Sequence, residues 1–286
     1  MNEMWPTYKV NDSFKLESFY SAFIRRCKEE YFFQGESHDF WEICYIIEGN
    51  VCVCTDDKII RLSKNQMIFH KPMEFHSIRT DGKTQASFLI ISFSAKGNLM
   101  DFFKDRVFSL NYTQKSEVIK IINLLEKLDA NTNDELPYTF YLDELLKTQN
   151  GFNFLKVYLE NMLYTLTESD TYVASLIKNP ETDIYTNALH IINDCLTERL
   201  SVTELAKRCR VSVSTLKKVF AKYNGHGIHE YIVQNKISVA KQMLTNGETV
   251  TSVAEALGFS SQSYFSTAFK RITGYLPSKC KEVLSK

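Results

Sequence analysis

The first part of the chain alternates short apolar runs with clusters of turn residues. The runs that we expect to form strands cover residues 41–48, 51–55, 58–62, 67–69, 76–79 and 85–93. Turns such as Glu48-Gly49-Asn50 and Asp56-Asp57 separate them. Strands of this length at this spacing are typical of an antiparallel sandwich or barrel. The pattern therefore predicts a β-rich first domain.

After residue 115 the apolar spacing becomes that of helices. Apolar residues with this spacing are Val118, Ile119, Ile122, Leu125 and Leu128. A second helical stretch covers 137–167, and Asn150-Gly151 should divide it into two helices. Residues 171–183 have little apolar periodicity and contain Asn179-Pro180. We therefore place the linker between two domains there.

The last part of the chain contains two short helices joined by a tight turn. Ser201 should cap the first helix, and Glu204 should complete a capping box with it. Ser212 should cap the second helix, 213–223. The inward stripe of this helix consists of Leu216, Val219, Phe220 and Tyr223. Two such helices, the second with polar and basic groups outward, are typical of a helix-turn-helix unit.

The helix-turn-helix pattern occurs twice. Thr249 takes the place of Ser201 48 residues later, with matching apolar positions after it. The second copy has one additional residue in its turn, so Gly274 lies 49 residues after Gly225. Residues 231–244 between the copies have the spacing of one long helix. The repeat predicts two units held at a fixed distance by this connecting helix.

Charge is distributed unevenly, although the whole chain is neutral. Residues 1–179 contain 20 Lys and Arg against 25 Asp and Glu, whereas residues 180–286 contain 14 against 9. Within the second part, residues 201–286 contain 13 basic against 5 acidic side chains. A basic second domain favours a nucleic acid as its partner.

Composition excludes several classes of protein. The chain has 286 residues, of which 44% are hydrophobic and 24% charged, as expected for two globular domains rather than a disordered chain. No run approaches the length of a membrane span, and the first residues do not resemble a secretory signal, so we expect no membrane partner. Seven Cys without framework spacing suggest reduced thiols and a cytoplasmic protein.

One predicted strand of the first domain carries polar and apolar side chains in alternation. Trp41, Ile43 and Tyr45 should point to one side of this strand. The side chains expected on the other side, which we assign to the barrel interior, are His38, Phe40, Glu42 and Cys44. His76 on a later strand should converge with them. These five residues form our candidate small-molecule site.

The run from His38 to Glu42, with Gly49 and His76 after it, resembles the two cupin motifs. It is most similar to the effector-binding cupin of the AraC/XylS family, which implies that the polar groups bind an effector. In catalytic cupins these positions hold a divalent metal, so His38, Glu42 and His76 are an alternative metal site. Glu36 replaces the first His of the usual His-x-His. A third interpretation is that these groups only satisfy one another. We favour the effector site and expect no cofactor.

The run Gly-Phe-Ser-Ser-Gln-Ser-Tyr-Phe-Ser-Thr-Ala-Phe-Lys-Arg at 258–271, then Gly274 and Pro277, resembles the signature of the AraC/XylS DNA-binding domain. The resemblance covers residues 184–283. With the strand and helix patterns it predicts an α+β fold of two domains: an antiparallel β-barrel of cupin or jelly-roll type with trailing helices, then an all-α domain with two helix-turn-helix motifs. We place the barrel at 1–112, a helical dimerisation and relay region at 113–170, the linker at 171–183, the DNA-binding domain at 184–286, and the two motifs at 202–224 and 250–273.

The face opposite the apolar stripe of each second helix should contact DNA. In the first unit these residues are Ser214, Thr215, Lys217, Lys218 and Lys222. In the second unit they are Gln262, Ser263, Ser266, Thr267, Lys270 and Arg271. Because residues early in a recognition helix reach base edges, Lys217 and Gln262 should read bases. The later basic residues Lys222, Lys270 and Arg271 should neutralise phosphates.

These features predict a sequence-specific, DNA-binding transcription regulator, not an enzyme, that a small polar effector such as a sugar or small acid controls. We expect promoter DNA and a second copy of the chain as partners, with RNA polymerase as a further candidate. One alternative is a metal-binding cupin enzyme fused to a DNA-binding domain. Another is an effector-blind protein whose first domain only dimerises, which an interior filled with aromatic side chains would favour.

Overall fold

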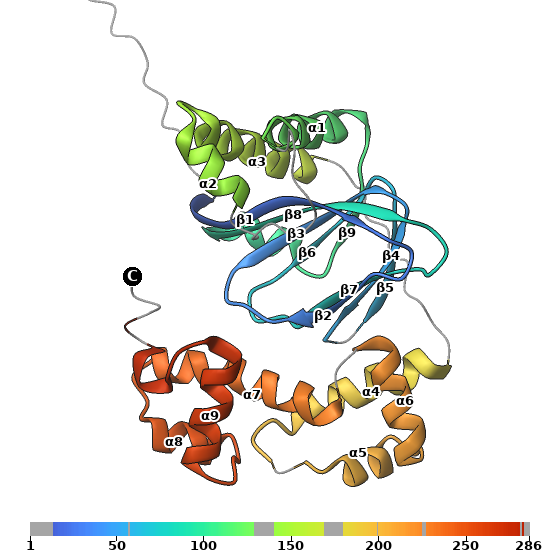
Figure 1. Ribbon diagram of the computed structural model, residues 1–286, viewed down its shortest axis with the longest axis vertical. Coiled ribbons are helices and arrows are strands. Elements are labelled where there is room, and N and C mark those ends of the chain that lie inside the picture. The colour runs from blue at the N-terminus through green and yellow to red at the C-terminus, as the bar shows by residue number, and fades with distance from the viewer. Residues whose placement is uncertain are drawn as a thin grey trace, which may run out of the picture.

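A computed structural model describes residues 14–56, 58–128, 140–168, 180–198, 200–224, 227–280 and 282 of the chain. A β-sandwich occupies the middle of the molecule, with helices packed on one of its sheets and a second, helical domain next to the other sheet (Figure 1). This arrangement confirms the predicted α+β fold of two domains.

The sandwich consists of two antiparallel sheets. Its strands are β1 (Lys15–Cys27), β2 (Phe32–Glu36), β3 (Trp41–Glu48), β4 (Asn50–Thr55), β5 (Ile59–Ser63), β6 (Gln66–His70), β7 (His76–Thr80), β8 (Ala86–Lys96) and β9 (Val107–Ser109). One sheet has the order β1-β8-β3-β6-β9 and the other the order β2-β7-β4-β5. Apolar side chains fill part of the space between the sheets, among them Ile46, Val53 and Phe88.

The strands expected from the sequence are present, and three further strands, β1, β2 and β9, were not predicted. β1 is the longest strand of the described sandwich, yet its apolar positions do not alternate regularly. Two register shifts in its pairing with β8, between Leu16 and Ser18 and between Phe19 and Ser21, interrupt the period of two. Such bulges remove the sequence signal for a strand without preventing the pairing.

Three helices pack on the five-stranded sheet: α1 (Tyr112–Glu126), α2 (Phe140–Lys147) and α3 (Gly151–Thr167). A core cluster joins Trp41, Ile43 and Tyr45 of β3 to the buried faces of these helices. This contact confirms that the second set of side chains on β3 points away from the sandwich interior. The break predicted at Asn150-Gly151 is also confirmed, whereas residues 137–139 of the predicted helical stretch lie outside the described residues.

The helical domain begins with α4 (Pro180–Asp194) and contains two helix-turn-helix motifs. The first consists of α5 (Val202–Arg208) and α6 (Val213–Tyr223), and the second of α8 (Val250–Ala256) and α9 (Gln262–Thr273). The long helix α7 (Ile228–Thr245) connects them, and a short 3-10 helix (Pro277–Lys279) follows α9. Each motif has its own core cluster. These bounds confirm the predicted repeat and its additional turn residue.

The turns of the two motifs have the same backbone conformation. Arg210 in the first turn has φ 57°, and Gly258, 48 positions later, has φ 64°. The left-handed region favours glycine. At Gly258 a Cβ atom would also lie 2.9 Å from the carbonyl oxygen of Thr197, so glycine is required there on both grounds.

Two local predictions about helix starts need correction. Ser201 accepts a hydrogen bond from the Glu204 amide as expected, but Glu204 does not complete the capping box. Its carboxylate instead accepts a hydrogen bond of 3.0 Å from Arg208 Nε. Arg208 lies four residues further along the helix, so it faces Glu204 and competes with the Ser201 amide for this carboxylate. The predicted linker, 171–183, overlaps the first turn of α4, which begins at Pro180; residues 171–179 lie outside the described residues.

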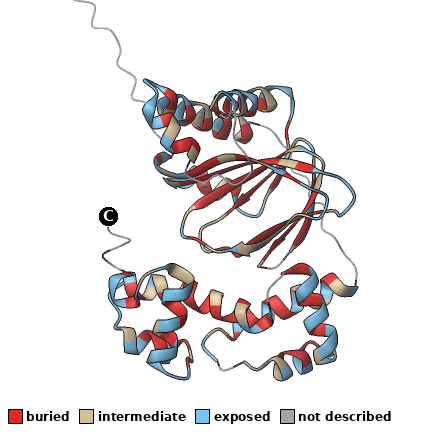
Figure 2. Ribbon diagram, in the orientation of Figure 1, coloured by how far each residue is buried: buried red, intermediate tan, exposed pale blue. Residues whose placement is uncertain are grey.

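The two domains share an apolar core. Ile59 and Phe75 of the sandwich belong to the same buried cluster as Tyr185 and Tyr231 of the helical domain. The rings of Phe75 and Tyr231 meet edge to face, with centroids 4.9 Å apart. Figure 2 shows buried positions on both sides of this contact. The four-stranded sheet therefore faces the candidate DNA-binding domain directly.

A bulge at Gly35 sets the path of β2 beside β7. The register of the two strands shifts between Phe33 and Glu36, so that Glu36 pairs with His76. Gly35 has φ 98°, and a Cβ atom there would lie 2.5 Å from Phe75 Cζ and 2.7 Å from the His76 carbonyl oxygen. Only glycine fits this position without displacing the strand.

We predict that Gly35→Ala destabilises the protein by about 2 kcal/mol or more, because strain at positive φ adds to a collision with β7. Gly82→Ala is the matched control, since Gly82 has φ 74° but open space around it. The control should cost only about 1 kcal/mol. Thermal unfolding of both variants measures the difference, and equal losses of stability would show that the close contact at Gly35 is unimportant.

Candidate functional site

A cavity of about 280 Å³ lies between the two sheets of the sandwich. One end is polar, with Glu36, Glu42, His70, His76 and Ser92 in its wall. The rest of the wall is largely aromatic and aliphatic and includes Tyr20, Phe23, Tyr31, Phe33, Phe40, Ile78, Phe88 and Ile90, together with Arg25. A cavity with an apolar wall and a few convergent polar groups is typical of a small-molecule site.

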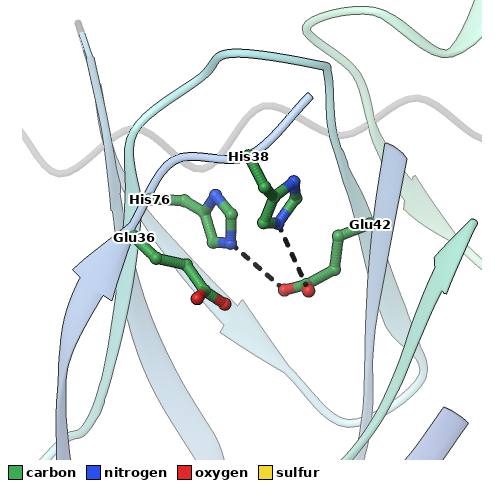
Figure 3. Close-up of side chains that lie close together, drawn as sticks. All are labelled: Glu36, His38, Glu42 and His76. Atoms are coloured by element: carbon green, nitrogen blue, oxygen red, sulfur yellow. Dashed lines mark ion pairs between the residues drawn. The ribbon is translucent and has the colours of Figure 1, made fainter. Parts of the chain in front are cut away.

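Four side chains meet at the polar end: Glu36, His38, Glu42 and His76 (Figure 3). One ligand-type atom from each lies within 4.8 Å of those of the other three. Glu42 Oε1 lies 3.2 Å from His76 Nε2, and Glu42 Oε2 lies 3.6 Å from His38 Nε2. Glu36 is exposed at the rim, whereas the other three side chains are buried. The cluster therefore lies between the interior and the mouth of the cavity.

Neighbouring groups hold these side chains in place. Ser92 on β8 donates a hydrogen bond of 2.8 Å to Glu42 Oε2, and its own oxygen lies 2.7 Å from that of Ser21 on β1. Ser92 and His70 are the two cross-strand partners of Glu42. His70 stacks on His76 with centroids 4.1 Å apart. The pairing of β3 with β6 and β8 thus surrounds Glu42 with polar neighbours.

Aromatic rings enclose the other side of the cluster. Phe40 stacks on His38 with ring centroids 3.8 Å apart, and on Tyr20 with centroids 4.0 Å apart. Tyr20 comes from β1, so this stack bridges the start of β3 and the outer strand of the same sheet. The stack fixes the plane of the His38 ring next to the cavity.

Burial and pairing shift the protonation of the polar groups. Burial raises the pKa of Glu42, but contacts with His38 and His76 outweigh it and hold that pKa well below its ordinary value. Burial lowers the pKa of His76, but its contact with Glu42 raises it to about 9. Burial holds the pKa of His70 well below its ordinary value and raises that of the Cys44 thiol. The polar end thus combines acceptors and donors, while Cys44 is a neutral thiol.

The structure brings together four of the five predicted effector-site residues in the cavity wall, Phe40, Glu42, Cys44 and His76, with His38 beside them. The sequence pattern predicted neither Ser92 nor His70 nor the aromatic wall from β1 and β2. It indicated Glu36 only as the replacement for a histidine ligand. The residue pattern within one strand shows which side chains share a face, but not which residues of other strands lie opposite them.

The second helices of both motifs present the predicted polar face to solvent. All eleven predicted DNA-contact residues are exposed except Ser266, which is half-buried. Some have partners within the domain: Arg271 binds Glu230 of α7 through two hydrogen bonds of 2.7 and 3.0 Å, and Gln262 Oε1 accepts one from Thr251. Lys222 pairs with Glu181. The basic side chains Lys217, Lys218 and Lys270 are exposed on the same faces.

None of the helices within the described ranges has both the length and the apolar character that a membrane span requires. All seven cysteines are free thiols and buried.

Comparison with known proteins agrees with both domains. A family model for the AraC-like ligand binding domain matches residues 18–144, and one for a helix-turn-helix domain matches residues 205–282. The chain is 25% identical over 261 residues to the Msm operon regulatory protein of Streptococcus mutans, covering 90% of this chain and 89% of that protein. It is 24% identical over 244 residues to the HTH-type transcriptional regulator YidL of Escherichia coli, covering 83% and 74%.

Among solved structures, ToxT from Vibrio cholerae O395 is 16% identical, with 96% of this chain and 98% of that chain covered and a TM-score of 0.38. The matches of the two family models fall on the sandwich with its first helices and on the pair of helix-turn-helix motifs. The chain belongs to the AraC family of DNA-binding transcription regulators, with an AraC-like ligand-binding domain followed by a helix-turn-helix domain.

Proposed function

We propose that this regulator recognises a specific promoter sequence through α6 and α9, and that a small polar molecule in the sandwich cavity controls its affinity for DNA. The observation that carries the proposal is that one strand, β7, contributes both to the cavity wall and to the contact with the helical domain. We propose a binding function rather than catalysis for the cavity, and action in the reducing cytoplasm, which the buried free thiols suit.

The cavity wall indicates the chemistry of the effector. Glu42, His76 and Ser92 place hydrogen-bonding groups at one end of the cavity. They bind one another, and the carboxylate and hydroxyl oxygens can still accept from a ligand. Aromatic rings line the rest of the cavity. A molecule with several hydroxyl groups or a carboxyl group on a compact apolar frame, such as a sugar or a small acid, matches both parts. The open cavity also argues against a first domain that only dimerises.

β7 provides a direct route from the cavity to the recognition helix. His76, Ser77 and Ile78 line the cavity. The next residue, Arg79, donates a hydrogen bond of 3.0 Å to the carbonyl oxygen of Lys222, at the end of α6. Its guanidinium also lies 5.0 Å from the ring centre of Tyr223. A ligand that shifts β7 would therefore move the end of α6 with it.

α7 fixes the two recognition helices relative to each other. With 18 residues it is about 27 Å long. Lys236 of α7 donates hydrogen bonds to the carbonyl oxygens of Glu198 and Leu257, and so ties α7 to the segment before α5 and to the turn between α8 and α9. Two recognition helices held rigidly on one connecting helix can enter two successive major grooves on one face of the duplex, which lie about 34 Å apart. We propose that one monomer occupies both grooves.

The helices of the first domain carry an exposed apolar face that we assign to a homodimer. Exposed large apolar side chains on α1 to α3 are Tyr112, Ile119, Leu146, Phe154, Val157 and Tyr164. Phe154, Val157 and Tyr164 follow one another on α3 at helical spacing. Helices α1 to α3 lie on the side of the sandwich that is opposite to the helical domain (Figure 1). A second copy would cover the exposed apolar face; RNA polymerase is a further candidate partner for the complex on DNA.

The first prediction concerns base recognition. After selection of preferred sites from random DNA, Lys217→Ala or Gln262→Ala should weaken binding to the selected site by about 1–3 kcal/mol and relax the preference at one position. Lys270→Ala should weaken binding to all sequences alike and reduce the salt dependence by about one counterion. Fluorescence anisotropy with selected and random duplexes measures both. Equal losses on both duplexes for Lys217→Ala would contradict base reading.

The second prediction concerns the connection between the domains. Arg79→Ala should leave effector binding intact, as measured by thermal shift with a panel of sugars and small acids. The effector changes the DNA dissociation constant about 5- to 150-fold in typical coupled systems. In Arg79→Ala the ratio of the two dissociation constants, with and without effector, should lie closer to one. Arg61→Ala, an exposed arginine on β5 of the same sheet, is the control. An unchanged ratio in Arg79→Ala would exclude this route.

The third prediction concerns the dimer. Val157→Asp places a charge on the exposed apolar face of α3, where Val157 is 56% exposed, so the fold should be retained. Sedimentation equilibrium should show a dimer for the unchanged protein and for Asn153→Asp, and a monomer for Val157→Asp. A dimer in all three proteins would place the interface elsewhere.

A further inference from the structure

The hydroxyl groups at the polar end of the cavity direct their protons at protein oxygens. Ser92 donates its proton to the Glu42 carboxylate. The oxygens of Ser21 and Ser92 lie 2.7 Å apart, so Ser21 must donate the proton of that second hydrogen bond. Both serines line the cavity, and both of their protons are used. What these two hydroxyl groups can still offer a ligand is their lone pairs.

The imidazole of His76 is directed at protein oxygens in the same way. Its Nδ1 lies 3.2 Å from the carbonyl oxygen of Glu74, and its Nε2 lies 3.2 Å from Glu42 Oε1 (Figure 3). His70 directs its Nδ1 at the Glu74 carboxylate, at 2.9 Å. A ligand group at the polar end must therefore donate hydrogen bonds, as hydroxyl and amino groups do. A carboxylate there would meet lone pairs and the negative charge of Glu42.

Arg25 lies on the cavity wall at a different level. Ser21, Phe23 and Arg25 alternate along β1, and all three line the cavity. In the ladder with β8, Ser21 pairs with Ser92. Arg25 pairs with Phe88, four residues away from that pair on both strands. At about 3.3 Å per residue, the backbones at the two levels are about 13 Å apart. Arg25 therefore lies toward the end of the cavity that is remote from the polar end.

The wall between these two levels is apolar. Cys44 and Ile90, which pair between β3 and β8, lie midway along it. Phe33 and Ile78, which pair between β2 and β7, line the cavity from the other sheet. A sugar along this wall would lose hydrogen bonds to water without replacing them, which is costly. The wall therefore favours a ligand with an apolar middle.

The guanidinium of Arg25 is suited to an acid group. It is always charged, and its planar fork of N–H donors binds a carboxylate through two parallel hydrogen bonds. Its carbon Cζ lies 5.4 Å from the centre of the Phe23 ring, which holds the side chain against the wall. Among the described residues that line the cavity, Arg25 is the single lysine or arginine. One positive charge matches a carboxylate better than a phosphate monoester, which carries up to about two negative charges.

We propose that the effector is an elongated carboxylic acid whose carboxylate binds Arg25 and whose far end donates a hydrogen bond, from a hydroxyl or amino group, to Glu42 or Ser92. An aryl ring or a short alkyl chain joins the two ends along the apolar wall. The inference rests on the proposed effector function of the cavity and names the ligand class. It selects an acid over a neutral sugar, and it places the acid group away from the histidines.

The test measures binding of matched ligands to the full chain by isothermal titration calorimetry. The probes are para-hydroxyphenylpropionate and ω-hydroxyoctanoate, each with its methyl ester and with the acid that lacks the hydroxyl group, and a panel of neutral pentoses and hexoses. Each hydroxy acid should bind about 10- to 100-fold more tightly than its ester, because the ester lacks the charge that Arg25 binds. It should bind about 2- to 10-fold more tightly than the acid without the hydroxyl group.

Variants of two adjacent arginines assign the effect. Arg25→Gln should remove the preference for acid over ester, and Arg25→Lys should retain part of it. Arg26→Gln is the matched control, because Arg26 is exposed and binds Glu126 of α1 at 3.2 Å, on the other face of β1. It should keep the full preference. Near-UV circular dichroism checks the fold of each variant, and the comparison of acid with ester in the unchanged protein remains decisive if a variant does not fold.

Four results would overturn the proposal: no binding of any of the acids; esters that bind as tightly as their acids; equal acid affinity in Arg25→Gln and Arg26→Gln; or a sugar that binds more tightly than every acid. DNA affinity is measured separately with the acid that binds best. An acid preference that Arg25→Gln removes, without any effect on DNA affinity, would refute effector control but support the ligand class. Tight binding of a sugar that does change DNA affinity would do the reverse.

Discussion

A carboxylate enclosed in the sandwich, that of Glu42, is the constraint around which the first domain is organised. Burying a charge is costly unless positive or hydrogen-bonding groups compensate it. Here the compensation comes from separate segments: Ser92 on β8, His76 on β7 and His38 just before β3. The contact with Ser92 requires the observed register of β3 with β8, in which Ser92 lies opposite Glu42. These contacts also leave a polar end in a cavity whose remaining wall is largely apolar.

The same strand that supplies His76 to this cluster also contacts the helical domain. Phe75, just before β7, packs on Tyr231 of α7, and Arg79 near its end binds the last turn of α6. The shared core of the two domains makes this contact apolar as well as hydrogen-bonded. Packed cores transmit displacements because they are dense and have few alternative arrangements. A change at the polar end of the cavity can therefore reach the recognition helix through a short, continuous path.

The sequence was sufficient for the features that depend on local periodicity. Apolar spacing predicted both helix-turn-helix motifs, and alternation along β3 correctly separated Glu42 and Cys44 from Trp41 and Ile43. Features that depend on pairing between distant segments were missed. Bulges hide the alternation of β1, and the position of Ser92 opposite Glu42 depends on a register that one strand alone does not specify. The bulge at Gly35 likewise places Glu36 in the cluster, although the cupin pattern has a histidine at that position.

The central claim is that occupancy of the cavity is transmitted through β7 to the DNA-binding domain. Hydrogen–deuterium exchange of the full chain tests it most directly, with and without the sugar or acid that most raises the melting temperature. The account predicts that the ligand changes exchange in residues 76–80 and, in the same experiment, at the end of α6 and the start of α7. A change confined to the sandwich, with both helices unaffected, would contradict the account.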